Sequence, residues 1–179
     1  MKLSGIEQKA AACFRVTIAQ FGLKLHEING ITYTCKTENG EWRFELMEKK
    51  TLFSRIYQTK ITYCCLCPGF HPDSGLIEWH YKKKWISENS AAFAKILNSR
   101  KTLNQLISSL DLEKVWIKHA GNRAEISVTP LPGSYISILL PPLRYFIRLK
   151  DNEVSKIRKI VLLFRQTAEA VSGSCSNIF

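Results

Sequence analysis

The chain has 179 residues, of which 45% are hydrophobic and 23% are charged. These fractions are typical of a folded globular protein and exclude a disordered chain. Lys and Arg (26) outnumber Asp and Glu (15), which gives a formal net charge of +11 at pH 7. The length suits one domain with its own core, so we expect a single α+β domain over 1–179, with 1–111 and 112–179 as candidate structural halves.

The first expected element is a helix over residues 5–21. Ser4 and Glu7 have the spacing of a capping box, in which each side chain binds a backbone amide at the start of the helix. The apolar residues between Ile6 and Phe21 recur at helical spacing and form one face. Gly22 is a candidate C-cap. We expect this helix to pack on a sheet.

Strand signals follow over residues 23–86. Two Asn-Gly pairs, at 29–30 and 39–40, favour two-residue hairpin turns because both residues tolerate positive φ angles. These turns predict strands over 23–28, 31–37 and 41–49. The third strand alternates apolar and charged side chains, as expected for a sheet with one solvated face. Extended chain is expected over 52–67, and a further strand over 76–86.

The second half begins with helical periodicity and returns to strands. A helix is expected to begin at Ser87 or Asn89, to be kinked or divided within 98–102, and to continue to Leu110. Prolines at 130, 132, 141 and 142 then divide residues 123–150 into short extended pieces. A final helix over 151–171 has six apolar residues on one side: Val154, Ile157, Val161, Phe164, Ala168 and Val171.

The order of these elements predicts an α+β fold. We expect a mainly antiparallel sheet of six to eight strands covered by about three helices. Strands followed by helices occur twice, which suggests a pseudo-duplicated strand-strand-strand-helix arrangement. The C-terminal helix is expected to cover the sheet. We expect a filled core between these layers, and the alternative is an apolar cavity lined by the run from Tyr135 to Leu149, together with Trp79 and Phe164.

The positive charge is concentrated in two windows, 82–101 and 141–170, whose net charges are +5 and +4. Such charge favours an anionic partner: an acidic protein, an acidic ligand or a nucleic acid. Basic and aromatic residues on one strand face can bind phosphates and stack on bases, but the same pattern also occurs on a solvated sheet face. The candidate ligand-binding residues are Arg144, Arg148, Lys82, Lys83, Lys84 and the neighbouring Trp85, which is a candidate aromatic residue at an interface rim.

A second class of function is suggested by Cys67, His71 and His80. A thiol nucleophile needs a cysteine of low pKa within reach of a histidine base, and a hairpin after Cys67 would bring these residues together. The spacing C-x-C-x3-H lacks the paired C-x2-C turns of a structural zinc site, so no metal and no cofactor are expected. The chain also has no phosphate-binding loop and no hydrolase motif. A small cysteine- and histidine-dependent enzyme is therefore the alternative to a binding function.

The N-terminal sequence has no apolar signal-peptide core, and the apolar run near 136–149 is interrupted too often to span a bilayer. Irregularly spaced cysteines favour reduced thiols and a cytoplasmic location. We therefore expect a cytoplasmic binding or interaction domain. Its basic surface or pocket would bind an anionic partner, or an apolar ligand with an acidic head. A protein-interaction adaptor is a further alternative, and the oligomeric state is undetermined.

Overall fold

The computed structural model describes residues 4–67, 75–80 and 82–175, and side-chain environments as far as residue 171. Within these residues, one antiparallel sheet of ten strands is accompanied by four helices. The predicted α+β class is confirmed. None of the described helices combines the length and the apolar composition that crossing a membrane requires.

The elements follow the predicted order closely. They are α1 (Gly5–Ala19), β1 (His26–Glu27), β2 (Thr32–Thr37), β3 (Gly40–Lys50), β4 (Ser54–Leu66), β5 (Gly75–His80), β6 (Lys84–Ile86), α2 (Ala91–Ser99), α3 (Lys101–Ser108), β7 (Leu112–Ala120), β8 (Arg123–Pro130), β9 (Ser134–Ile138), β10 (Leu143–Ile147) and α4 (Asp151–Cys175). The capping box of α1 is present, and the second helical region is divided at Arg100. The strand expected over 76–86 is instead a hairpin of β5 and β6, with Lys83 at a positive φ of 56° in the turn.

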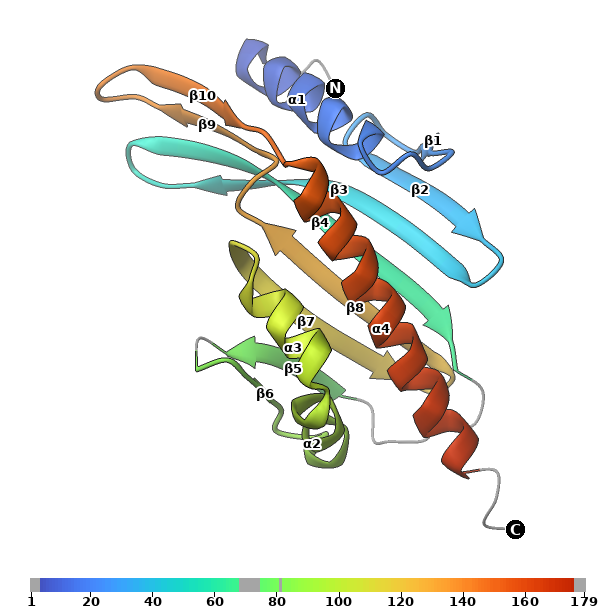
Figure 1. The fold of residues 1–179 in the computed structure, drawn as a ribbon. Coiled ribbons are helices and arrows are strands. Elements are labelled where there is room, and N and C mark those ends of the chain that lie inside the picture. The colour runs from blue at the N-terminus through green and yellow to red at the C-terminus, as the bar shows by residue number, and fades with distance from the viewer. Residues whose placement is uncertain (1–3, 68–74, 81, 176–179) are drawn as a thin grey trace.

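The sheet branches at β4. Its main path has the order β1-β2-β3-β4-β8-β7-β5-β6, while β9 and β10 lie off this path. β4 pairs with β3 along one edge. On the other edge, residues 61–66 of β4 pair with β8, and residues 54–57 pair with β9. β10 then pairs with β9, so the β9–β10 hairpin and the ends of β3 and β4 form a separate wing of the sheet (Figure 1).

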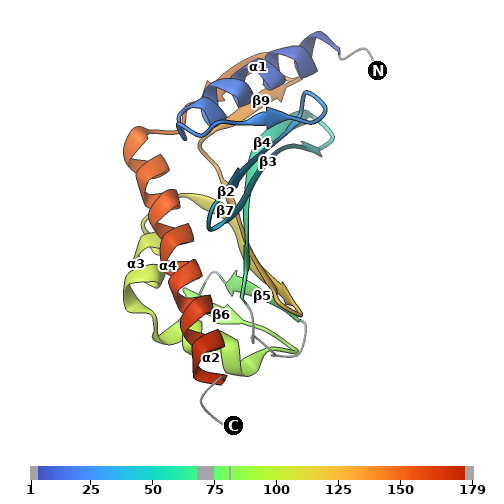
Figure 2. The same cartoon turned by 90° about the vertical axis from the view of Figure 1, so that its right-hand side faces the viewer.

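All four helices lie on one side of the sheet (Figure 2). α1 covers β9 and the adjoining part of β4, while α4 runs obliquely over the middle of the sheet with α2 and α3 beside it. Gln20, at the end of α1, donates from Nε2 to the backbone oxygen of Leu149 at 2.8 Å. At the start of α4, Glu153 accepts a hydrogen bond from the backbone N–H of Lys150 at 2.7 Å. The first contact links the end of α1 to the start of α4, and the second caps α4.

The interface between α4 and the sheet is filled by side chains. Five of the six predicted apolar residues of α4 are buried, and Val171 packs at the edge of the same core. Ile157 and Phe164 are fully buried, and Leu149 is buried beside them. Trp79 is half-buried against this core. Phe164 and Trp79 therefore belong to a packed core, as expected, and do not line a cavity.

We expect Phe164→Ala to lower the free energy of unfolding by about 3–5 kcal/mol, because it removes a large buried side chain and leaves a cavity. Leu162→Ala is the control on the same helix, since Leu162 is 45% exposed. This control should change stability by no more than about 0.5 kcal/mol. Chemical denaturation followed by circular dichroism measures both, and equal losses for the two variants would contradict the buried position of Phe164.

Candidate functional site

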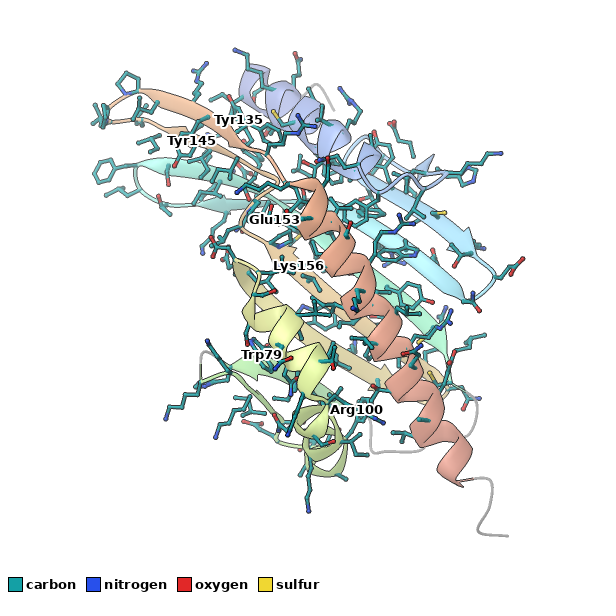
Figure 3. The ribbon with its side chains drawn as sticks, in the orientation of Figure 1. Trp79, Arg100, Tyr135, Tyr145, Glu153 and Lys156 are labelled. Carbon is teal, nitrogen blue, oxygen red and sulfur yellow. The ribbon has the colours of Figure 1, made fainter. Side chains whose placement is uncertain are left out.

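The predicted basic residues lie at opposite ends of the sheet. Arg144 is on β10, in the wing, and Arg148 is exposed just after that strand. Lys82, Lys83 and Lys84 lie at the turn between β5 and β6, which end the other branch. The tyrosines labelled in Figure 3 mark the wing, and the labelled Trp79 lies in the other branch. The two basic windows therefore do not form one surface.

The expectation that Trp85 lies at an interface rim is wrong. Its side chain is only 2% exposed, and its indole nitrogen donates to Oδ1 of Asn104 at 2.9 Å. The reason is the chain reversal at Lys83, which pairs Trp85 with Trp79 on the helix-covered face. Their ring centroids are 5.2 Å apart. Trp85 is thus a core residue beneath α2 and α3.

The helix-free face of the central sheet carries paired charges of both signs. Lys60 Nζ lies 2.8 Å from a carboxylate oxygen of Glu45 and 5.6 Å from the ring centroid of Trp116. Lys114 lies 2.9 Å from Glu78 on the neighbouring strands. Cross-strand pairs of this kind neutralise each other. This wide face is therefore a solvated sheet surface without a concentrated positive field.

The wing presents a different arrangement, in which three basic side chains and one serine share one position across four strands. Arg144 of β10 pairs with Ser137 of β9, Ser137 pairs with Arg55 of β4, and Arg55 pairs with Lys50 of β3. We call these four residues the basic row. Two residues further along β4, Tyr57 packs beside α1. Because side chains alternate between faces, the basic row lies on the side of the wing that α1 covers.

A groove of about 790 Å³ lies between the basic row, the start of α1 and the two hairpin turns. We call it the wing groove. α1 contributes Lys9 and Ile6 to it. The remaining lining residues are Ser4, Gly5, Lys50, Thr51, Leu52, Phe53, Ser54, Arg55, Ser137, Ile138, Leu139, Pro142 and Arg144.

The electrostatic balance of the wing groove is positive. Glu48 lies 3.2 Å from Lys50 and 3.8 Å from Arg55, so it partly neutralises this pair. Glu7 belongs to the capping box, and the Ser4 amide and hydroxyl lower its pKa, with smaller contributions from Arg55 and Lys50. In the part of the chain that the structure describes, Lys9 and Arg144 have no ion-pair partner. These two cations remain available to an anion.

Apolar side chains crowd the two turns that border the groove. The backbone N–H of Leu139 donates to the oxygen of Phe53 at 2.8 Å, which holds the turns side by side. Hairpin turns normally carry small polar residues, so exposed Leu and Phe there are unusual. Leu52 is 83% exposed. The exposed apolar residues of the turns, which we call the tip residues, are Leu52, Phe53, Leu139, Leu140 and Leu143.

Of the predicted ligand-binding residues, only Arg144 lines this groove; the sequence analysis did not single out Lys9, Lys50, Arg55 or the tip residues. A local signal was present. The segment Lys49–Arg55 places two bulky apolar residues in a turn between basic residues. Such a turn offers no core to bury them, because a two-stranded hairpin end is open to solvent.

The proposed thiol site is not assembled among the described residues. Cys67 is fully buried, with its sulfur 3.6 Å from that of Cys65, and His71 lies outside the described residues. Cys65 is level with Gly75 in the sheet, whereas His80 lies five residues along β5 from Gly75. That is about 17 Å at the rise of a strand. Cys67 and His80 are therefore not brought together.

The environment of Cys65 disfavours the thiolate. The hydrogen bond between Cys67 and Cys65, together with burial, raises the pKa of Cys65 far above its ordinary value. A nucleophilic or metal-binding cysteine needs the opposite shift. Among the residues that the structure describes, no group of three or more His, Cys, Asp or Glu side chains could hold a metal ion.

A serine–histidine pair that was not anticipated lies nearby in the core. Ser90 Oγ is 2.7 Å from Nε2 of His119, and both side chains are buried. The His119 ring contacts Phe93 edge-on, and a side chain in place of Gly75 would collide with Ser90. The pair links the start of α2 to β7, and it satisfies polar atoms in a packed region. We interpret it as structural.

We expect iodoacetamide to modify Cys65 and Cys67 at least about tenfold more slowly in the native protein than in guanidinium chloride, because both thiols are buried. Mass spectrometry of peptides reports each site. Cys13 and Cys64, which are half-buried, provide an internal comparison and should react before the buried pair. Preferential modification of native Cys67 would contradict this result and favour the thiol enzyme.

Comparison with known proteins gives one family. Residues 19–168 match DUF3156, described as a protein of unknown function. The matched range includes both hairpin turns and the basic row, while Lys9 precedes it. No curated protein and no solved structure matches the chain. Since the match extends over most of its length, the chain belongs to the DUF3156 family.

Proposed function

We propose that this protein is a binding module, and that the wing groove binds an amphiphile with an anionic head group and an apolar chain. One observation carries the proposal: the basic row lies directly beside exposed apolar side chains on two adjoining turns. A ligand that satisfies both surfaces must itself have a negatively charged part and an apolar part.

The basic row supplies the contacts for the head group. Neighbouring strands are about 4.8 Å apart, so Arg55 lies one strand from Lys50 and two strands from Arg144. Long basic side chains can contact one head group over such distances. A guanidinium group binds a carboxylate or phosphate through two parallel hydrogen bonds, and the hydroxyl of Ser137 lies between the two arginines as a further donor.

The apolar side of the groove sets the strength of binding. Each buried methylene contributes about 0.8 kcal/mol, which corresponds to a roughly fourfold change in Kd. An exposed ion pair contributes only about 0–1 kcal/mol. The chain of the ligand, in contact with Ile6, Phe53 and Leu139, should therefore dominate affinity, while the cations select the sign of the head group.

Two observations favour an amphiphile over a nucleic acid. Phe146, the aromatic residue on the same strand face as Arg144 and Arg148, packs against the cluster beneath α1 and is not free to stack on bases, while Tyr145 lies on the opposite face of the strand. The central sheet, which would offer the longest track for a phosphate backbone, carries ion pairs such as Lys60–Glu45. Nucleic-acid recognition depends on an unpaired row of cations with accessible aromatic rings.

The test compares dodecyl phosphate with dodecyltrimethylammonium, each below its micelle concentration, by isothermal titration calorimetry. The anionic compound should bind at least about tenfold more tightly than the cationic one, because Lys9 and Arg144 attract the first head group and repel the second. Decyl phosphate should bind up to about 16-fold less tightly than dodecyl phosphate because it has two fewer methylenes. Equal binding of the anionic and cationic compounds would contradict a role for the basic row.

A charge-reversal pair identifies the site. We expect Lys9→Glu/Arg144→Glu to raise the Kd for dodecyl phosphate at least about tenfold, because the substitution reverses the two unpaired cations. The matched control is Lys82→Glu/Lys83→Glu, which changes the net charge equally at the far end of the sheet. If the control lost as much affinity as the groove variant, binding would follow net charge, and the groove assignment would be rejected.

A further inference from the structure

We infer that the amphiphile is a lipid within a membrane, and that the protein docks on an anionic bilayer surface with its two hairpin turns inserted at the interface. This inference rests on the proposed function because it uses the same basic row and tip residues. It adds the partner surface and its orientation relative to the fold. The same anionic head and apolar chain could also belong to an amphiphile that is free in solution.

The tip residues form one projecting end of the molecule. The turns of the β3–β4 and β9–β10 hairpins extend from the same end, beside the start of α1 (Figure 1). The hydrogen bond from Leu139 to Phe53 keeps them together. Leu52 and Leu140 are 83% and 68% exposed. Solvent exposure of adjoining large apolar residues is costly in water and is typical of a surface that meets an apolar phase.

Apolar side chains continue onto the helix-free face of the wing. Tyr145, Ile136 and Ile56 share one position across β10, β9 and β4, and Leu143 pairs with Ile138 in the next position. These five side chains are half-buried or exposed. Tyr145, labelled in Figure 3, combines an aromatic ring with a polar hydroxyl, as residues at a membrane–water interface do. The same position on β3 is occupied by Lys49, which is paired with Glu113 at 2.7 Å. The wing is thus apolar at its end and mainly apolar on this face, and basic on the other.

The backbone of the turns suits shallow insertion. An unsatisfied N–H or C=O group is costly to remove from water. The N–H of Thr51 donates to the oxygen of Ser54, and the N–H of Ser54 donates to Oγ1 of Thr51. Pro141 and Pro142 have no N–H to desolvate. Together with the Leu139–Phe53 bond, these features reduce the number of donors that insertion would leave without water.

Charge complementarity favours a membrane over a second copy of this chain. Lys9, Lys50, Arg55 and Arg144 surround the turns, where they would lie at the level of lipid phosphates when the tip residues are inserted. A second copy docked on the same end would bring these cations against their own equivalents. The net charge of +11 opposes such an association and promotes binding to an anionic surface.

The test is flotation of the full chain with vesicles of phosphatidylcholine alone, or with about 30 mol% phosphatidylserine to provide a negative surface. We expect binding only to the vesicles that contain phosphatidylserine, with partial release as salt is raised from about 50 to about 500 mM. Phe53→Ser/Leu140→Ser should lower the partition coefficient at least about tenfold while every cation is kept.

The matched control is Leu76→Ser/Ile86→Ser, which removes two exposed apolar side chains in the other branch of the sheet. It should bind vesicles as the unmodified protein does. Because all four substituted residues are exposed, thermal unfolding should show both variants folded. Equal binding by the tip variant and the control would indicate adsorption by charge alone and would overturn insertion of the turns.

Dodecyl phosphate titration separates this inference from the proposed function. If the unmodified chain binds dodecyl phosphate but neither vesicle preparation, the ligand is a free amphiphile and membrane docking is overturned, while the proposed function stands. If it binds neither probe, both are overturned. A dimer in solution that dissociates on Phe53→Ser/Leu140→Ser would assign the turns to contact between copies, and would also overturn membrane docking.

Discussion

The pairing of β4 with three different strands is the constraint on which the rest of the structure depends. One edge of β4 pairs with β3, and the other edge is shared between β8 and β9. A strand has only two edges, so this division forces the sheet to branch. The branch toward β8 builds the wide sheet beneath α4. The branch toward β9 builds the wing, where no strand beyond β10 is present among the described residues.

The branching explains why the two parts of the molecule differ chemically. Over the main branch, α4 buries the apolar face in a core centred on Phe164, and the outer face is neutralised by pairs such as Lys60–Glu45. The wing is shorter, and α1 covers only its inner part through the small cluster of Ala10, Tyr57 and Tyr135. At the end of the wing, the start of α1 lies beside the two turns but leaves the tip residues exposed. Packing in the core therefore does not account for the apolar side chains of Leu52 and Leu140.

Local patterns predicted most of the elements but did not predict the site. The spacing of Ser4 and Glu7 was sufficient for the cap of α1, because a capping box involves residues three apart. The position of Trp85 was predicted wrongly because the turn between β5 and β6 contains lysines and lacks the Gly or Asn that usually indicates a hairpin turn. The two strands of this hairpin therefore resembled one strand in the sequence. The basic row was not predicted because its members are as distant in the sequence as Lys50 and Arg144. Only the register of the strands brings them together.

By itself, the sequence determined the fold class, the apolar face of the C-terminal helix and the excess of positive charge, since these follow from periodicity and composition over short distances. Tertiary structure alone decided which charges are neutralised and which face solvent together. Lys60 meets Glu45 across a strand pair, whereas Arg144 has no partner among the described residues. The physical reason is that charge neutralisation and apolar exposure depend on neighbours in space, and the neighbours of the wing come from three separate segments of the chain.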